Sequence, residues 1–218
     1  MCAYYPESKV EIHGFEAKHY NSILDILTFG KYSGLMRRAI ELMEIEQSDK
    51  ILDFGAGTGK NACLMAKYIS ESGEIVGLDI SDEMISQFER RCKDFPNVKI
   101  SNRRIDQPLD YDGYFDKVFI SFVLHGFPQD ARMQIIKNAF NSLRAGGEFF
   151  VLDYGEFSLD DMPFYLKIPF KIAECKYAFD FIKRDLAKML ESEKFTVIDK
   201  YSLFGKYIVL MKARKNEL

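Results

Sequence analysis

The sequence predicts an α/β, doubly wound fold around a mostly parallel, seven-stranded sheet that ends in an antiparallel C-terminal hairpin. Two observations predict it. Short apolar segments alternate with segments of helical spacing over residues 50–154, a pattern that builds right-handed βαβ crossovers. Two apolar segments then follow one another around Leu203-Phe204-Gly205, and neighbouring strands with so short a connection pair antiparallel.

The predicted strands are short segments that are apolar throughout or along one face. The almost unbroken apolar character of 115–123 is typical of a central parallel strand that is buried on both faces. We expect strands at 51–54, 74–80, 98–101, 115–123, 148–154, 195–202 and 206–211. We expect helices at 61–70, 81–93, 130–143 and 184–192, and two helical pieces within 22–46, broken around Gly30 and Gly34.

Length and composition favour a single globular unit. A chain of 218 residues with 47% apolar residues can bury a substantial core. We expect residues 1–46 to form an arm and helices that cover a site. Residues 47–218 are expected to form the main domain, with an insertion at about 157–182.

Charge and cysteine spacing exclude several function classes. The net charge of −3 argues against a nucleic-acid partner, which usually requires a basic excess. The four cysteines form no C-x-x-C pair, so no metal site is expected. The start shows no charged-then-apolar signal pattern and no segment approaches the ~18 apolar residues of a membrane span, so the expected location is the cytoplasm.

The most specific motif is a glycine-rich segment that closes the first strand and opens a helix, Asp53-Phe54-Gly55-Ala56-Gly57-Thr58-Gly59. Glycines at such a turn let the backbone approach a ligand closely. A dinucleotide-binding G-x-G-x-x-G motif needs a small residue at the position of Lys60. A P-loop needs glycine in place of Phe54 and Ser or Thr in place of Asn61. The remaining pattern is acid-x-G-x-G-x-G.

In this pattern the sequence resembles the class I S-adenosylmethionine (SAM)-dependent methyltransferases, which have a Rossmann-like fold. The resemblance covers residues 50–155 and recurs in order through later motifs. These are Val76-Gly77-Leu78-Asp79-Ile80, Asp106, Ser121-Phe122-Val123-Leu124-His125 and Leu143-Arg144-Ala145-Gly146-Gly147-Glu148-Phe149-Phe150-Val151.

The resemblance implies a cofactor site for SAM and assigns its parts. Asp79 would accept the ribose hydroxyls, or else serve as a solvated strand-end acid or helix N-cap. Asp106 would accept the adenine amino group between Ile80 and Ile105, or else be an exposed loop acid. Asp53 would orient the loop and reach the SAM amino group. Also expected in the cofactor site are Gly55 and Gly57, facing the methionyl part, with Ala56, Thr58, Gly59, Met84, Ser121 and Phe122.

The N-terminal segment is similar to that of the ubiquinone/menaquinone C-methyltransferases. The similarity lies in residues 19–30, His19-Tyr20-Asn21-Ser22-Ile23-Leu24-Asp25-Ile26-Leu27-Thr28-Phe29-Gly30, and in the strand end Leu152-Asp153-Tyr154. The chain departs from that family at residues 31–35, at Arg144-Ala145, and at Asp153, where the family has Glu. The resemblance implies a small-molecule acceptor of the quinol or phenol class.

Residues 157–182 are rich in Phe and Tyr and are interrupted by Pro163 and Pro169. They could close an apolar pocket over a hydrophobic acceptor, pack as an amphipathic element, or form a dimer contact. A monomer and a homodimer therefore both stay open, as does a peripheral membrane contact.

Methyl transfer needs positioning and, for a phenol, a base. His125 follows the fourth predicted strand, at the sheet edge where ligands bind, and is the candidate base; the alternative is a structural histidine. Tyr20 is a second candidate, to cover the SAM tail or touch the acceptor, and Tyr32 a third. Cys63 and Cys92 fall in helices far apart in sequence, so no thiol chemistry is expected.

Three other functions compete with a small-molecule methyltransferase. An NAD(P) oxidoreductase is disfavoured by Lys60 and by the antiparallel hairpin. A nucleic-acid or protein methyltransferase is disfavoured by charge and because Ser121-Phe122-Val123-Leu124 replaces the Asn/Asp-Pro-Pro-Tyr/Phe motif of amino-group methyltransferases. A SAM-binding regulator or scaffold without catalysis stays open.

Overall fold

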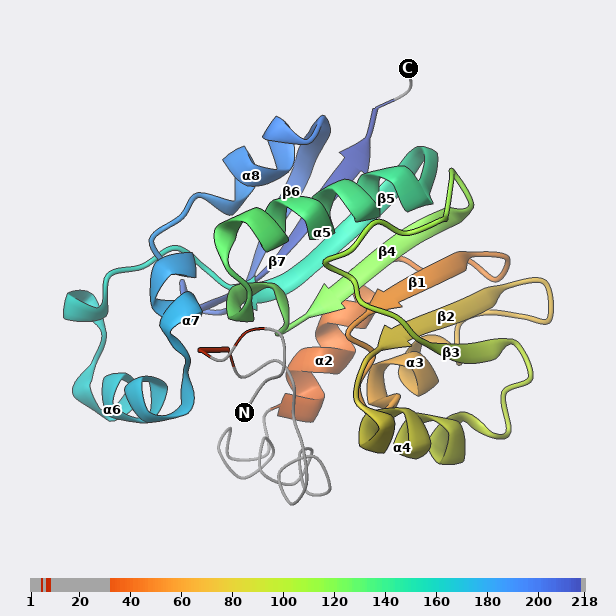
Figure 1. Cartoon of the computed structure of the whole chain (residues 1–218), viewed down its shortest axis with the longest axis horizontal. Helices are drawn as coiled ribbons and strands as arrows, with labels where there is room; N and C mark the ends of the chain where they lie inside the picture. Colours follow the sequence, from red (N-terminus) through yellow and green to blue (C-terminus); the bar gives the residue numbers. More distant parts are fainter. Residues whose placement is uncertain (1–4, 6, 9–31, 217–218) are drawn as a thin grey trace.

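A computed structural model describes residues 5, 7, 8 and 32–216 (Figure 1). Helices and strands alternate as far as β5, except that no helix separates β3 from β4, and the chain ends in a hairpin. The elements are α2 (Tyr32–Glu41), β1 (Lys50–Phe54), α3 (Lys60–Met65), β2 (Glu74–Asp79), α4 (Asp82–Cys92), β3 (Val98–Asn102), β4 (Phe115–Ser121), η1 (Leu124–Gly126), α5 (Gln129–Ser142), β5 (Leu143–Tyr154), η2 (Leu159–Asp161), α6 (Phe164–Ala173), α7 (Lys176–Phe181), α8 (Leu186–Ser192), β6 (Phe195–Phe204) and β7 (Ile208–Lys215).

The strands form one seven-stranded sheet in the order β3-β2-β1-β4-β5-β7-β6. The pairs from β3 to β5 are parallel, and β7 runs antiparallel to both β5 and β6. This confirms the predicted doubly wound, Rossmann-like sheet with its C-terminal hairpin. The order reverses between β1 and β4, and a switch point of this kind is where open α/β sheets bind ligands.

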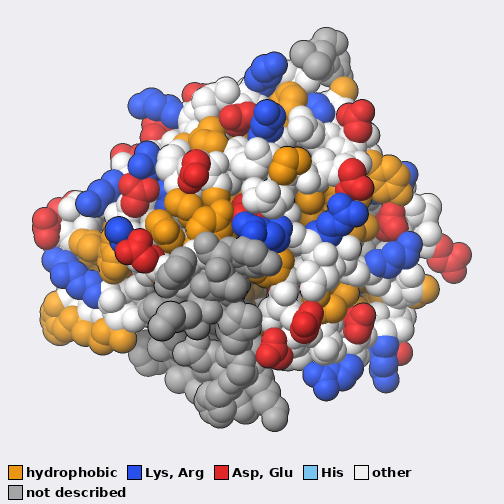
Figure 2. Space-filling view, viewed as in Figure 1, with side chains coloured by type: hydrophobic (Ala, Val, Ile, Leu, Met, Phe, Trp, Pro, Cys, Tyr) orange, Lys and Arg blue, Asp and Glu red, His pale blue; other side chains and the backbone are white. Residues whose placement is uncertain are grey.

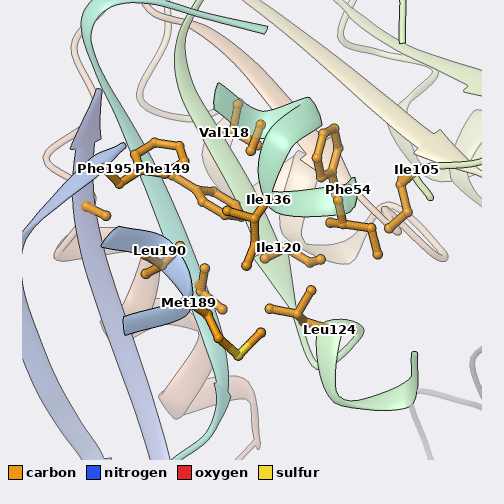
Figure 3. Close-up of a cluster of buried hydrophobic side chains, with 14 of the residues drawn as sticks. Phe54, Ile105, Val118, Ile120, Leu124, Ile136, Phe149, Met189, Leu190 and Phe195 are labelled. Carbon is orange, nitrogen blue, oxygen red and sulfur yellow. The ribbon is translucent and has the colours of Figure 1, made fainter. Parts of the chain in front are cut away.

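Helices cover both faces of the sheet, and each face has its own core. On one face, α5 and α8 pack on the strands through Ile136, Met189 and Leu190 (Figure 3). On the other, α2, α3 and α4 contribute Met36, Met65 and Phe88. Because both faces are covered, the central strands are apolar nearly throughout. Figure 1 shows α6 and α7 beyond the sheet edge to which the arrowheads of β1 and β4 point.

The helices differ from the prediction in two places. Gly34 lies inside α2 and does not break it. A Cβ added at Gly34 would meet no atom of the described residues within 4 Å, and the helix is held by its buried apolar stripe, which outweighs glycine's low helix propensity. The predicted piece before Gly30 lies outside the described residues. The helix predicted at 61–70 ends at Met65.

Several strand boundaries also differ. β5 begins at Leu143, five residues before the predicted start at 148, and Leu143 pairs with Phe115 of β4. β4 ends at Ser121, because Phe122 has a φ of 53° and turns the chain out of the sheet. β7 continues to Lys215, past the predicted end at Met211, since it pairs with β5 and β6 along that length. The sequence did not indicate this longer strand because its last residues include Lys212, Arg214 and Lys215. Within the described part of the chain, no helix is long and apolar enough to cross a bilayer.

Candidate cofactor and acceptor site

The glycine-rich loop joins β1 to α3 at the carboxyl edge of the sheet. Gly55, Gly57 and Gly59 have φ values of 69°, 55° and 77°, which only glycine adopts without strain. A Cβ at Gly55 would lie 2.7 Å from a methyl of Val123, and one at Gly59 would lie 2.9 Å from the Phe88 ring. Around Gly57 the nearest atom of the described residues would be 3.9 Å away. The middle of the loop is therefore open to a ligand.

Asp53, the acid that precedes the loop, is 1% exposed, and neither of its carboxylate oxygens has a hydrogen-bond partner among the residues that the structure describes. Burial and the nearby charge of Asp79 raise the pKa of Asp53 to about 8. A buried carboxylate with no donor requires either a proton or a neighbouring cation. The site therefore offers a place for a positively charged group.

Asp79 ends β2 and accepts three backbone amides. Gly57 donates to one carboxylate oxygen at 2.8 Å, and Ile80 and Ser81 donate to the other at 2.8 and 3.0 Å. Burial raises the pKa of Asp79, while these amides act in the opposite direction. The N-cap of α4 is Ser81, not Asp79. Asp79 thus ties the glycine loop to the end of the neighbouring strand.

Asp106 lies in the loop after β3 and is buried. Its carboxylate accepts Nε and Nη2 of Arg104 at 3.1 and 2.5 Å and the Tyr5 hydroxyl at 2.7 Å. Burial raises the pKa of Asp106, but these bonds hold it below its ordinary value. Asn138 donates to the carbonyls at 105 and 107 and fixes the loop.

The other predicted cofactor residues line the same edge. Ala56, Thr58, Met84 and Ile105 are buried and Ile80 is half-buried. The hydroxyl of Ser121 accepts Nδ2 of Asn61 at 3.0 Å, across the gap between β4 and α3. Sequence reasoning missed Asn61 as a site residue. Its side-chain carbonyl oxygen is buried and has no partner within the described part of the chain, and its place just after the glycine loop was the available signal.

His125 lies in η1, directly after β4, between two carboxylates. Its Nδ1 is 2.7 Å from Asp153, which also accepts the His125 backbone amide at 3.1 Å. Its Nε2 is 3.4 Å from Glu174. Burial lowers the pKa of His125, but the two carboxylates raise it well above 6.5. The imidazole is therefore held as a cation in this arrangement.

Glu174 and Tyr154 extend this cluster into the 157–182 insertion. Glu174 follows α6 and accepts the Tyr154 hydroxyl at 2.6 Å, while the Tyr154 ring packs 4.8 Å from that of His125. Phe122 places its ring 6.2 Å from Tyr154 and 6.1 Å from Tyr32, which starts α2. Glu174 was missed because no local pattern relates it to a histidine 49 positions earlier in the chain. Tyr20 lies outside the described residues.

The cluster resembles no metal centre. Within the described ranges, no group of three or more His, Cys, Asp or Glu side chains could hold a metal ion. The arrangement instead places a histidine, two carboxylates and aromatic rings beside the end of β4. The glycine loop and its acids lie next to it, at the end of β1 and β2. The two parts could thus serve a cofactor and an acceptor.

Comparison with known proteins agrees with this geometry. Residues 51–147 match the model of a family described as a methyltransferase domain. The ubiquinone/menaquinone biosynthesis C-methyltransferase of Proteus mirabilis is 28% identical over 149 residues, 67% of this chain and 59% of that protein. The demethylmenaquinone methyltransferase of Staphylococcus carnosus is 30% identical over 111 residues, 50% and 46% of the two chains. The chain therefore spans roughly half the length of these relatives.

Solved structures share the fold. A SAM-dependent methyltransferase from Aquifex aeolicus superposes with a TM-score of 0.67 at 15% identity, over 93% of this chain and 100% of the other. The 1,6-didemethyltoxoflavin-N1-methyltransferase of Burkholderia thailandensis gives 0.64 at 17% identity, over 95% and 93%. The domain match and these relatives support SAM as the cofactor. Residues 51–147 thus match a methyltransferase domain, and the chain is similar to quinone-biosynthesis methyltransferases over part of its length.

Proposed function

We propose that this chain transfers a methyl group from SAM to a small hydrophobic acceptor with an acidic hydroxyl, of the quinol or phenol class. The observation that carries the cofactor half is the buried, unpartnered carboxylate of Asp53 beside the glycine loop. The acceptor class rests on the names of the relatives, which act in quinone biosynthesis. The cluster of aromatic rings around His125 fits such a planar, apolar molecule.

The residues present fit SAM by charge. The SAM amino group and sulfonium are cationic, and Asp53 supplies a buried carboxylate that lacks a partner. Asp79 already accepts three amides of the roughly four hydrogen bonds that a carboxylate can accept. To hold both ribose hydroxyls, Asp79 would therefore give up the hydrogen bond that it accepts from Gly57 and accept a ribose hydroxyl in its place. The Gly57 amide would then face the methionyl part of SAM. Asp106 would hold the adenine amino group in addition to Arg104 and Tyr5.

SAM supplies an activated methyl group and a good leaving group, so the residues of the chain mainly position and desolvate the acceptor. We assign His125 as the base. Asp153 holds Nδ1, which leaves Nε2 as the nitrogen that faces the acceptor. Glu174 lies on Nε2 and stabilises the imidazolium. Because Nε2 of an imidazolium already carries a proton, Glu174 or solvent must first take that proton, and the neutral His125 then accepts the proton of the acceptor hydroxyl.

We also propose how the remaining parts serve the reaction. Residues 157–182 form the cover over the acceptor, because Glu174 and Tyr154 connect this segment to His125. Residues 1–46 close the cofactor side, where Tyr20 would cover the SAM tail, and residues 47–218 form the SAM-binding domain. We place the protein in the cytoplasm, as a monomer or homodimer.

The cover also offers a surface for peripheral membrane contact. Phe164, Tyr165, Ile168 and Ile172 lie on one face of α6 and are 56–75% exposed, and Figure 2 shows hydrophobic side chains gathered where α6 lies. Lys167 and Lys171 lie on the same helix, which has no acidic residue. Such a helix can lie in a membrane interface and receive a lipid-soluble acceptor there. Sedimentation with anionic vesicles tests this: Ile172→Ser and Phe164→Ser should reduce binding.

Product formation tests the whole proposal. The purified chain is incubated with SAM and a panel of demethylated quinols, simple phenols, amines and carboxylic acids, and products are identified by mass spectrometry. Methylation of a quinol or phenol, lost in His125→Gln, is the expected result. Methylation of amines or acids alone would refute the acceptor class. Cofactor binding without turnover of any acceptor would favour a SAM-binding regulator.

A further inference from the structure

Two cysteines that are distant in sequence meet behind the glycine loop. The backbone amide of Cys63 donates to the Gly59 carbonyl at 2.9 Å, and the Cys92 thiol donates to the same carbonyl at 3.6 Å. The two thiols are near enough to influence each other's pKa. Their separation in sequence indicated no thiol chemistry, but the contact of α3 with α4 brings them together. Cys92 is buried, whereas Cys63 is partly exposed.

Cys63 faces a basic groove between α2, α3 and α4. The groove has a volume of about 450 Å³ and its described lining residues are Ser33, Arg37, Lys60, Cys63, Leu64, Lys67, Arg91 and Phe95. Four of these carry a positive charge and none is acidic. Within the part of the chain that the structure describes, Arg37, Lys67 and Arg91 form no salt bridge. The groove is therefore suited to an anion.

The two thiols differ in reactivity. The neighbouring Cys92 thiol lowers the pKa of Cys63, partly offset by burial, and the charges of Arg91 and Lys67 lower it further. The neighbouring Cys63 and burial raise the pKa of Cys92. Since the thiolate is the nucleophile, the partly exposed Cys63 in the basic groove is the reactive thiol of the pair.

We propose that Cys63 is a modification site, at which an anionic disulfide of the oxidised glutathione class exchanges with the protein thiol in the basic groove. The Cys63 thiolate attacks one sulfur of the disulfide. The disulfide bond of the reagent breaks, a new bond forms between Cys63 and one glutathione, and the second glutathione leaves as a thiolate that takes up a proton. No additional oxidant is required. This proposal does not depend on methyl transfer.

Charge complementarity favours oxidised glutathione as the ligand of the basic groove. Glutathione carries two carboxylates and one ammonium, so its disulfide is a net anion, and Lys67 and Arg91 lie in the groove beside Cys63. Leu64 and Phe95 supply apolar surface for the peptide backbone and methylene groups. A neutral disulfide would gain only the apolar contacts. Electrostatic attraction of this kind raises association rates roughly tenfold or more at low salt.

The test compares oxidised glutathione with the neutral hydroxyethyl disulfide, in the full chain carrying Cys2→Ser and Cys175→Ser. Adduct rates are measured by mass spectrometry of the intact protein, and peptide mapping locates the adduct. We expect addition at Cys63, abolished in Cys63→Ser, with a preference for glutathione of roughly tenfold over the neutral reagent at low salt. A disulfide between Cys63 and Cys92 that forms after the adduct would also support the proposal, because it requires the same first attack.

Variants separate the groove from general surface charge. Lys67→Gln with Arg91→Gln should reduce the preference for glutathione severalfold, and Cys92→Ala should slow both reagents. Arg38→Gln is the matched control, since Arg38 is an exposed cation of α2 that pairs with Glu41 and does not line the groove. Equal rates with the two reagents, an equal effect of Arg38→Gln, or no addition at Cys63 in the folded protein would overturn the proposal.

Discussion

The cofactor half of the site and the acceptor half are built in different ways. In the cofactor half, Asp53, the glycine loop and Asp79 lie within 27 consecutive residues, and the backbone conformation itself requires the glycines. In the acceptor half, His125, Asp153 and Glu174 come from three separate elements, and side-chain contacts alone unite them. A local backbone requirement leaves a motif in the sequence, whereas a contact between distant side chains leaves none.

The largest expected effect is on methyl transfer, from a substitution in the acceptor half that leaves the cofactor half intact. His125→Gln removes the proposed base, so methyl transfer should fall by about 10² to 10⁴. SAM affinity should change less than about twofold, because His125 touches none of the loop residues described above. Steady-state kinetics and calorimetry on the same preparation measure the two quantities. Glu174→Gln, which removes the charge that stabilises the imidazolium, should reduce the rate far less; an unchanged rate in His125→Gln would show that His125 is not the base.

The next largest effect is on stability, from a substitution that the backbone of the glycine loop cannot accept without strain. Gly55→Ala should lower the free energy of unfolding by roughly 2–4 kcal/mol. The left-handed conformation accounts for about 1–2 kcal/mol of this and the clash with Val123 for the rest. Gly57→Ala has a similar φ but open space, so only the first part should apply. Urea denaturation compares the two variants. Equal losses would mean that Val123 simply moves aside.

A pH titration sharpens the comparison at Asp53. Its pKa rises from about 4 in the unfolded chain to about 8 in the fold, so its contribution to stability is present below pH 4 and is lost as the pH rises through 8. Relative to Asp53→Asn, the ligand-free protein should lose at most about 1.4 kcal/mol per pH unit over this range. Denaturation at a series of pH values measures the difference. If the stability difference between the two proteins did not change with pH, Asp53 would have a charged or hydrogen-bonding partner in the folded protein.

The smallest effect concerns α2, outside both halves. Gly34→Ala should stabilise the protein by about 0.5–1 kcal/mol, because Gly34 lies within the helix and an added methyl group would meet nothing. Thermal unfolding measures the gain. A loss of stability would support the original prediction that Gly34 breaks the helix.

The sequence therefore predicted the fold class and the antiparallel C-terminal hairpin, while the residues of the cofactor half stay a prediction. The predicted β4 was too long because Phe122 is apolar like the strand before it. In the structure Phe122 has a positive φ, and its ring packs near Tyr32 and Tyr154. The predicted β7 ended too early because burial of Lys212 against Glu44 and Glu148 depends on neighbours distant in sequence. Glu174 and the meeting of Cys63 with Cys92 depended on tertiary packing for the same reason.

Cofactor binding tests the central claim most directly. The purified chain is titrated calorimetrically with SAM, S-adenosylhomocysteine and NADH, with Asp79→Asn as the site variant and Asp82→Asn, a neighbouring exposed acid, as its control. We predict binding of SAM and S-adenosylhomocysteine with a Kd on the order of micromolar. Asp79→Asn should weaken it at least roughly tenfold, Asp82→Asn should leave it unchanged, and NADH should not bind. Absence of SAM binding, or binding of NADH in its place, would contradict the account.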